Sequence, residues 1–172
     1  SMVERLSSSS QPLGDDITLL VIESAESYPV GVLRFPADPA TLKEMRERIR
    51  AMAASVGATA ELTEAIVVAL NEACMNVIQH GYKGSSQGEY ELRVGHHRGR
   101  HAMIFELLDH APPIDVSRVK SRPLEDIRPG GLGVHFIEQL MDEMVFCAPP
   151  EGYGNQLYMS IRMDKKTLLE IS

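Results

Sequence analysis

Three polar residues fall four positions apart in the segment NEACMNVIQH, which spans residues 71–80: Glu72, Asn76 and His80. Residues four apart in a helix lie one turn above each other, so this spacing predicts a line of polar side chains. The line follows one edge of an apolar face, where a cleft wall would lie. The same pattern on its own is more often a solvated helix shoulder, so the hypothesis of a site needs support from other segments.

A second group of residues able to do chemistry is DHAPPID, residues 109–115, at the end of an apolar strand. A carboxylate carried to the edge of a sheet at Asp109 is suited to accept a hydrogen bond from an exocyclic amine. The small Ala111 and the following prolines would let a flat ring approach the backbone. An ordinary turn after a strand explains the same residues.

A third group is the glycine-rich segment RPGGLG, which contains Gly130, Gly131 and Gly133 and leads into a helical pattern. Glycines before a helix expose backbone N–H groups at the positive end of the helix dipole, and this arrangement suits phosphates. A flexible loop is the alternative explanation when the segment is taken alone.

The elements that must position these groups follow from periodicity and capping signals. We expect helices over residues 39–57, 60–81 and 134–144, with Asp38 and Thr59 as N-caps of the first two. Expected strands cover residues 28–38, 89–97, 101–109, 144–150 and 155–163. Early helices, a central hairpin and closing strands predict an α+β fold with helices on one face of a mostly antiparallel sheet.

Composition limits the classes of partner and compartment. The 172 residues carry a net charge of −7, so the chain lacks the basic field that binds nucleic acid. Two cysteines without a CxxC pair indicate a reducing, cytoplasmic compartment, and no apolar window is long enough to predict a membrane span.

Together, in this order and spacing, the three segments resemble the ATP-binding boxes of the GHKL superfamily of gyrase, Hsp90, histidine kinases and MutL. The similarity is greatest to its bacterial anti-sigma-factor serine kinases and covers about residues 29–163. It implies the Bergerat ATP-binding fold, a two-layer α/β sandwich with helices on one face of a mixed, mostly antiparallel sheet. The implied cofactors are ATP and Mg²⁺.

The resemblance also implies residue roles. Asn76 matches the asparagine that binds Mg²⁺ in the family, and Glu72 matches the glutamate that serves as general base. Amide oxygens are hard ligands suited to Mg²⁺, and a free carboxylate can take a hydroxyl proton, so these residue types fit those roles. Asp109 matches the aspartate that recognises the adenine amine.

Further nucleotide-binding residues follow from the same match. The implied phosphate-binding loop contains Gly130, Gly131, Leu132 and Gly133, and His80, Ala111 and Pro113 complete the expected nucleotide contacts. The family usually has glycine where Ala111 stands, so we expect a slightly altered adenine contact. Basic residues of the intervening loop resemble a short ATP lid: Arg118, Lys120, Arg122 and Arg128.

The segment GDDITLLVIE, residues 14–23, separately resembles the last strand of bacterial metal-dependent serine phosphatases, in which Asp15 would help to bind a metal. We therefore expect residues 1–24 to contain an expression scar, a linker and the remnant of a preceding phosphatase domain. Residues 25–172 would form the ATP-binding kinase domain.

The leading hypothesis is an ATP-dependent protein-serine kinase of a bacterial partner-switching pathway. Its expected substrate is a small anti-sigma-factor antagonist, with a sigma factor or other regulator as a second candidate partner and a homodimer as a candidate assembly. The alternative is an ATP-binding module that sequesters its partner without significant kinase activity. Glu72 favours the kinase, because binding alone needs no base.

Overall fold

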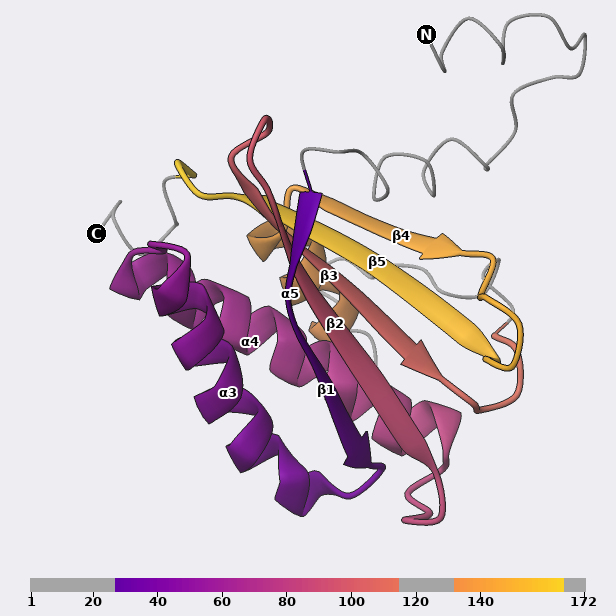
Figure 1. The fold of residues 1–172 in the computed structure, drawn as a ribbon. Helices are drawn as coiled ribbons and strands as arrows, with labels where there is room; N and C mark the ends of the chain where they lie inside the picture. Colours follow the sequence, from indigo (N-terminus) through magenta and orange to yellow (C-terminus); the bar gives the residue numbers. More distant parts are fainter. Residues whose placement is uncertain (1–26, 115–131, 166–172) are drawn as a thin grey trace, which may run out of the picture.

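The computed structural model describes residues 27–114 and 132–165, in which helices pack on one face of a five-stranded sheet (Figure 1). The strands are β1 (Ser27–Pro36), β2 (Glu89–His97), β3 (Ala102–Asp109), β4 (Glu143–Cys147) and β5 (Asn155–Arg162). The helices are α3 (Leu42–Ser55), α4 (Ala60–Asn76) and α5 (Leu132–Leu140). The sheet order is β1-β2-β3-β5-β4, and all four described pairings are antiparallel, so the predicted α+β two-layer fold is confirmed.

The two N-terminal helices begin where the capping signals predicted. The Asp38 side chain accepts a hydrogen bond from the Ala40 backbone N–H at 2.8 Å, in a short 3-10 turn (Pro39–Thr41) that leads into α3. Thr59 Oγ1 accepts from the Leu62 N–H at 3.2 Å and starts α4. Each cap pairs an N–H that the helix itself leaves without a partner.

The core lies between the helices and one face of the sheet. Alternate residues of the strands point to this face, as the period of two requires. The fully buried side chains that meet there include Ile49 of α3, Ile66 and Leu70 of α4, and Leu92 and Phe105 of the sheet. The apolar face predicted for the second helix is thus the face that packs against the core.

The second helix does not remain an α-helix to its end. Residues 77–81 form a π-helical turn (Val77–Gly81), in which the Tyr82 N–H donates to the Val77 carbonyl at 3.0 Å. A π turn spaces its hydrogen bonds five residues apart and so rotates the following residues around the axis. The line predicted from Glu72 through Asn76 is therefore broken before His80, which is exposed.

The last helix is shorter than predicted at its C-terminus. We expected it to reach residue 144, but α5 ends at Leu140 and β4 starts at Glu143. The Asp142 N–H donates to the Ser160 carbonyl of β5 at 2.9 Å, and Lys165 Nζ donates to the Leu140 carbonyl at 2.9 Å. These bonds connect the segment after α5 to β5 and to the residues that follow it, so the chain leaves the helix and enters β4.

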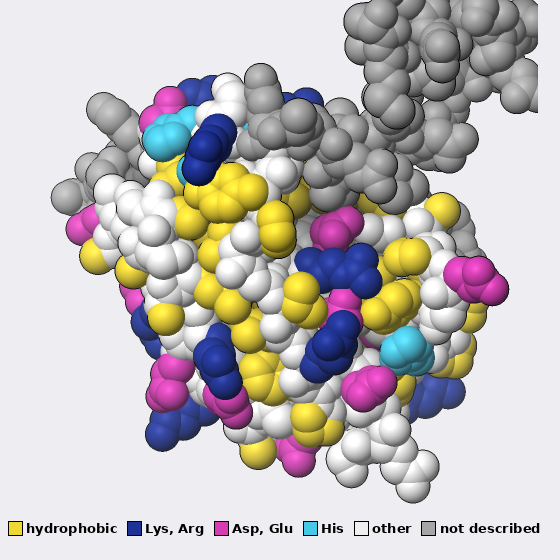
Figure 2. All heavy atoms as spheres, viewed as in Figure 1, with side chains coloured by type: hydrophobic (Ala, Val, Ile, Leu, Met, Phe, Trp, Pro, Cys, Tyr) yellow, Lys and Arg dark blue, Asp and Glu magenta, His cyan; other side chains and the backbone are white. Residues whose placement is uncertain are grey.

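The face of the sheet opposite the helices carries interleaved charged and apolar side chains (Figure 2). Glu91 is 4% exposed there and accepts hydrogen bonds from Arg34 at 2.6 Å and from Arg93 at 2.5 Å. Burial alone would raise the pKa of Glu91, but the two guanidinium groups lower it overall. A buried carboxylate paired with two solvent-accessible guanidinium groups thus lies among the apolar side chains of this face.

Some predictions lie outside the described residues. These are the early strand with Asp15, the basic loop residues and two of the loop glycines, Gly130 and Gly131. Among the described residues, no helix has the length and apolar character needed to cross a membrane.

Candidate functional site

Two of the segments singled out in the sequence meet between α4 and α5. A Cβ built on Gly133, in the first turn of α5, would lie 2.9 Å from Glu72 Oε2 and 3.6 Å from Asn76 Oδ1 and Nδ2. A real Cβ essentially never sits so close to another heavy atom, so only glycine fits here without displacing Glu72. The backbone at the start of α5 thus lies directly beside the carboxylate and the amide.

Asp109 occupies the end of β3 and is 3% exposed. Its Oδ1 accepts hydrogen bonds from the Ala111 backbone N–H and from Asn155 Nδ2, both at 2.8 Å. Neither bond uses Oδ2, and within residues 27–114 and 132–165 no donor is bonded to that oxygen. Burial raises the pKa of Asp109, although the two hydrogen bonds oppose the shift. The carboxylate therefore has one oxygen fixed by the protein and one available to a ligand.

Asn155 is a residue that the sequence analysis missed. It is paired with Asp109 across β3 and β5, and its Nδ2 also lies 3.3 Å from the carbonyls of Ala111 and Pro112. Its Oδ1 accepts from the Ile114 N–H at 2.8 Å. One buried amide thus orders the 109–114 segment. Only the strand register reveals this, because Asn155 reads in the sequence as an ordinary residue after a turn.

Gly154, which precedes Asn155, was missed as well. Its N–H donates to the Asp109 carbonyl at 2.7 Å, and a Cβ at this position would lie 1.9 Å from the Ala111 carbonyl oxygen. A backbone atom cannot move aside as a flexible side chain can. Residue 154 must therefore be glycine for the 109–114 segment to keep its path.

The end of the π-helical turn contacts the segment that follows β3. A Cβ added to Gly81 would lie 3.1 Å from the Ala111 Cβ, which is 2% exposed. Gly81 thus leaves space for the Ala111 methyl group. This contact accommodates the alanine that stands where the resembled family usually has glycine.

The other predicted site residues are placed less closely together. His80 and Pro113 are exposed, and Leu132 begins α5. The structure therefore joins Glu72, Asn76 and Gly133 directly, and joins Asp109 and Ala111 to the same helix through Gly81.

The candidate site contains two groups of residues with different binding properties. A buried acceptor lies at the end of β3, and a carboxylate and an amide of the last turns of α4 meet the N-terminus of α5. A ligand with an amine-bearing ring and an anionic group separated by a linker would match both groups.

Comparisons with known proteins indicate the family to which the chain is similar. Residues 35–161 match the histidine kinase-like ATPase domain family. The serine-protein kinase RsbW of Bacillus subtilis is 29% identical over 120 residues, which cover 65% of this chain and 74% of the relative. The RsbW of Oceanobacillus iheyensis is 28% identical over 142 residues, covering 78% and 87%.

A solved structure shares the fold. The crystal structure of the RsbU and RsbW domains of a Mycobacterium tuberculosis protein superposes with a TM-score of 0.51 at 18% identity. The match covers 80% of this chain but only 34% of the other, so this chain spans about a third of that protein.

The contact between Gly81 and Ala111 predicts a non-additive pair of substitutions. Gly81→Ala should lower the free energy of unfolding, because overpacking costs ~1–3 kcal/mol against the ~0.5–1 kcal/mol that alanine gains over glycine in a helix. In the Ala111→Gly background the same change should be neutral or stabilising. Urea unfolding of the parent, both single variants and the double variant measures this coupling. Additive effects would show that the two methyl positions do not compete.

Proposed function

The chain belongs to the histidine kinase-like ATPase domain family, and from this membership we propose that it is an ATP-dependent protein-serine kinase. The observation that carries the proposal is the contact of Gly133 with Glu72 and Asn76. It brings a backbone suited to phosphate beside a carboxylate and an amide, which are the groups that phosphoryl transfer to a hydroxyl requires. The relatives named serine-protein kinase RsbW support the same reaction.

Asp109 is the proposed acceptor for the adenine amine. Its Oδ2 has no donor within the described residues, while Ala111 and Asn155 hold Oδ1. A hydrogen bond between a carboxylate and an amine N–H is charge-assisted and so favours adenine over a ring that presents an acceptor. The nucleotide then extends along α4 toward Gly133, with Gly130, Gly131 and Leu132 as further proposed phosphate contacts and His80 and Pro113 at the rim.

Mg²⁺ is the proposed metal, with Asn76 as its protein ligand. The residues fit this ion, since Asn76 offers a hard amide oxygen and Gly133 adds no side chain to the space beside it. When bound, Mg²⁺ would neutralise charge on the phosphates during transfer. Asn76 orients this end of the nucleotide.

Glu72 is the proposed general base. Within the described residues no cation pairs with its carboxylate, so it is available to accept a proton. It would take the proton of the acceptor serine as the hydroxyl oxygen attacks the terminal phosphorus of ATP, and the bond from that phosphorus to the bridging oxygen would break to release ADP. Gly133 places no side chain against this carboxylate on the side facing α5.

The proposed substrate is a serine of a small anti-sigma-factor antagonist in a bacterial partner-switching pathway. The resemblance of residues 29–163 to anti-sigma-factor serine kinases supports this class, and a sigma factor or other regulator is a second proposed partner. Incubation with Mg-ATP and a candidate antagonist should raise the antagonist's mass by one phosphoryl group. A cytoplasmic location is proposed with it, which the presence of only two cysteines and no CxxC pair supports.

Glu72→Gln should reduce phosphoryl transfer by ~10²–10⁴-fold, because a neutral amide cannot act as the base. Nucleotide affinity should stay close to that of the parent. Single-turnover phosphorylation and calorimetric ADP titration measure the two effects separately.

Two further variants serve as comparisons for Glu72→Gln. Glu64→Gln changes an exposed glutamate of the same helix, which pairs with Arg50 at 2.7 Å, and should retain full transfer. Asn76→Ala should instead weaken Mg²⁺-dependent nucleotide binding. An equal loss of ADP affinity in Glu72→Gln would contradict the role of base. An ATP-binding module without kinase activity would show no transfer even in the parent.

Asp109→Asn should weaken ADP binding by ~1.5–3 kcal/mol, because the neutral amide replaces a charge-assisted acceptor and in one of its two orientations presents a donor to a donor. The parent's ADP affinity should fall as the pH is lowered through the raised pKa of Asp109, since the protonated acid no longer accepts from the amine. The asparagine variant should lack this pH dependence. Calorimetry across pH measures both.

Glu106→Gln is the matched control for Asp109→Asn. Glu106 lies on the same strand, is hydrogen-bonded to Gln156 at 2.8 Å, and burial likewise raises its pKa. Its side chain lies on the opposite face of the sheet, so its loss should leave ADP affinity unchanged. If Asp109→Asn binds ADP as tightly as the parent, adenine is recognised elsewhere.

We also propose that residues 25–172 form the kinase domain and that residues 1–24 belong to a preceding domain and its linker. The match to the ATPase domain family begins at residue 35 and ends at residue 161, within the proposed kinase domain. Deletion of residues 1–24 should therefore leave ADP affinity unchanged in calorimetry. A truncated protein that stays folded but loses ADP binding would place the boundary earlier.

A further inference from the structure

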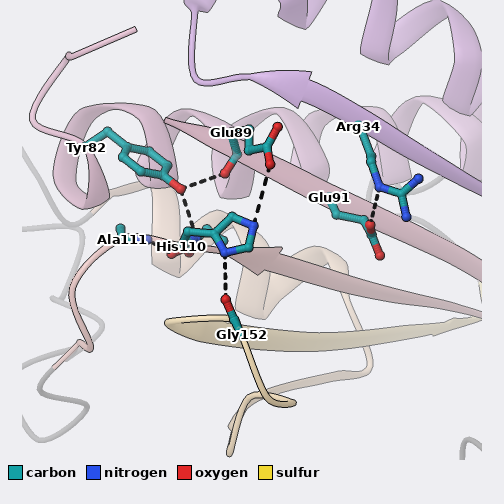
Figure 3. Close-up of polar contacts among 8 residues, drawn as sticks. Arg34, Tyr82, Glu89, Glu91, His110, Ala111 and Gly152 are labelled. Carbon is teal, nitrogen blue, oxygen red and sulfur yellow. Dashed lines mark hydrogen bonds and ion pairs between the residues drawn. The ribbon is translucent and has the colours of Figure 1, made fainter. Parts of the chain in front are cut away.

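His110 connects three parts of the chain at the end of the sheet (Figure 3). Its backbone N–H donates to Tyr82 Oη at 2.9 Å, and that hydroxyl donates to the Glu89 carbonyl at 2.6 Å. Its ring Nδ1 lies 2.8 Å from the Gly152 carbonyl oxygen. A carbonyl oxygen only accepts, so Nδ1 carries the proton.

The His110 ring makes two further contacts. It stacks on Tyr153 with a centroid distance of 4.8 Å and an interplanar angle of 15°. Its Nε2 lies 3.7 Å from Glu89 Oε1 at the start of β2. The imidazole thus binds the turn between β4 and β5 by a hydrogen bond and by stacking.

That turn carries the residues that organise Asp109. Gly152 has a positive φ of 90°, and the Tyr153 N–H donates to the Pro150 carbonyl at 3.1 Å, which closes the turn. Gly154 and Asn155 follow directly, and they bond the Asp109 carbonyl and carboxylate. A displacement of the turn would therefore move the donor that holds Asp109 Oδ1.

Residues 109 and 110 point to opposite faces of the sheet, because side chains alternate along an extended chain. Asp109 meets Asn155 on the helix side, whereas His110 meets Gly152 and Tyr153 on the other side. The segment 152–155 is thus held on both faces of the sheet. Asp109 contacts it on the helix side, and His110 contacts it on the opposite side.

We infer that His110 is a positioning residue for adenine recognition. By fastening the turn at Gly152 and Tyr153, it holds Asn155 against Asp109 Oδ1 and leaves Oδ2 directed to the ring amine. This inference rests on the proposed role of Asp109. Glu72 lies near the C-terminal end of α4 and Gly133 in the first turn of α5, and the contacts of His110 are made with other residues, so we expect its effect to fall on nucleotide affinity.

Three variants at position 110 separate the contacts. His110→Ala removes both contacts to the turn and should weaken ADP binding about tenfold, since the loss of a side-chain hydrogen bond and a ring stack is of this order. His110→Asn keeps a donor near the Nδ1 position and should bind ADP within about threefold of the parent. His110→Phe keeps the stack but loses the donor and should resemble His110→Ala.

Kinetics and a double-mutant cycle distinguish positioning from a general loss of structure. In His110→Ala the KM for ATP should rise by a larger factor than kcat falls. In the Asp109→Asn background, His110→Ala should cause little further loss of ADP affinity, because its effect acts through Asp109. Thermal unfolding of each variant shows whether it is folded.

The outcomes separate this inference from the proposed function. A parent protein that does not bind ADP would overturn the proposed function itself. A parent that binds ADP while folded His110→Ala binds equally well would overturn only the role of His110. Equal losses from His110→Ala with and without Asp109→Asn would also overturn it, because the histidine would then affect ADP binding independently of Asp109.

Discussion

A buried carboxylate that is satisfied on one oxygen is the constraint on which the rest of this structure depends. Burying an ionisable group is costly unless hydrogen bonds compensate for the lost water. Asp109 receives that compensation from its own following backbone and from Asn155, which the antiparallel register of β3 and β5 brings opposite it. The sheet therefore both buries the group and fixes the direction of its remaining oxygen.

The helix layer supplies the second half of the site through close backbone approach. Gly133 lies beside Glu72 and Asn76, Gly81 lies against Ala111, and Gly154 lies against the Ala111 carbonyl. Each contact excludes a side chain where the chain must come near a functional group. The lack of a side chain at these three glycines therefore helps to position the site, because it lets the backbone approach the functional groups.

Much of this architecture could be predicted from the sequence. Caps such as Asp38 and Thr59 act over a few residues, and strand alternation reports which face is buried, so local patterns were sufficient for most elements. The pairing of Asp109 with Asn155 could not be predicted, because 46 positions separate the two residues and only the register joins them. The π-helical turn after Asn76 was missed for a related reason. Its wider spacing brings Gly81 to Ala111, a contact that is distant in the sequence.

The contact between Gly81 and Ala111 also restricts how this sequence can change over evolutionary time. The space between these two positions holds one methyl group, which the structure places on residue 111. A lineage that moves the methyl to residue 81 is expected first to lose it at residue 111 and then to gain it at residue 81. Glycine at both positions leaves a small gap, whereas alanine at both requires the neighbouring atoms to shift. The two residues are therefore expected to vary as a correlated pair among relatives, with the double-alanine combination depleted.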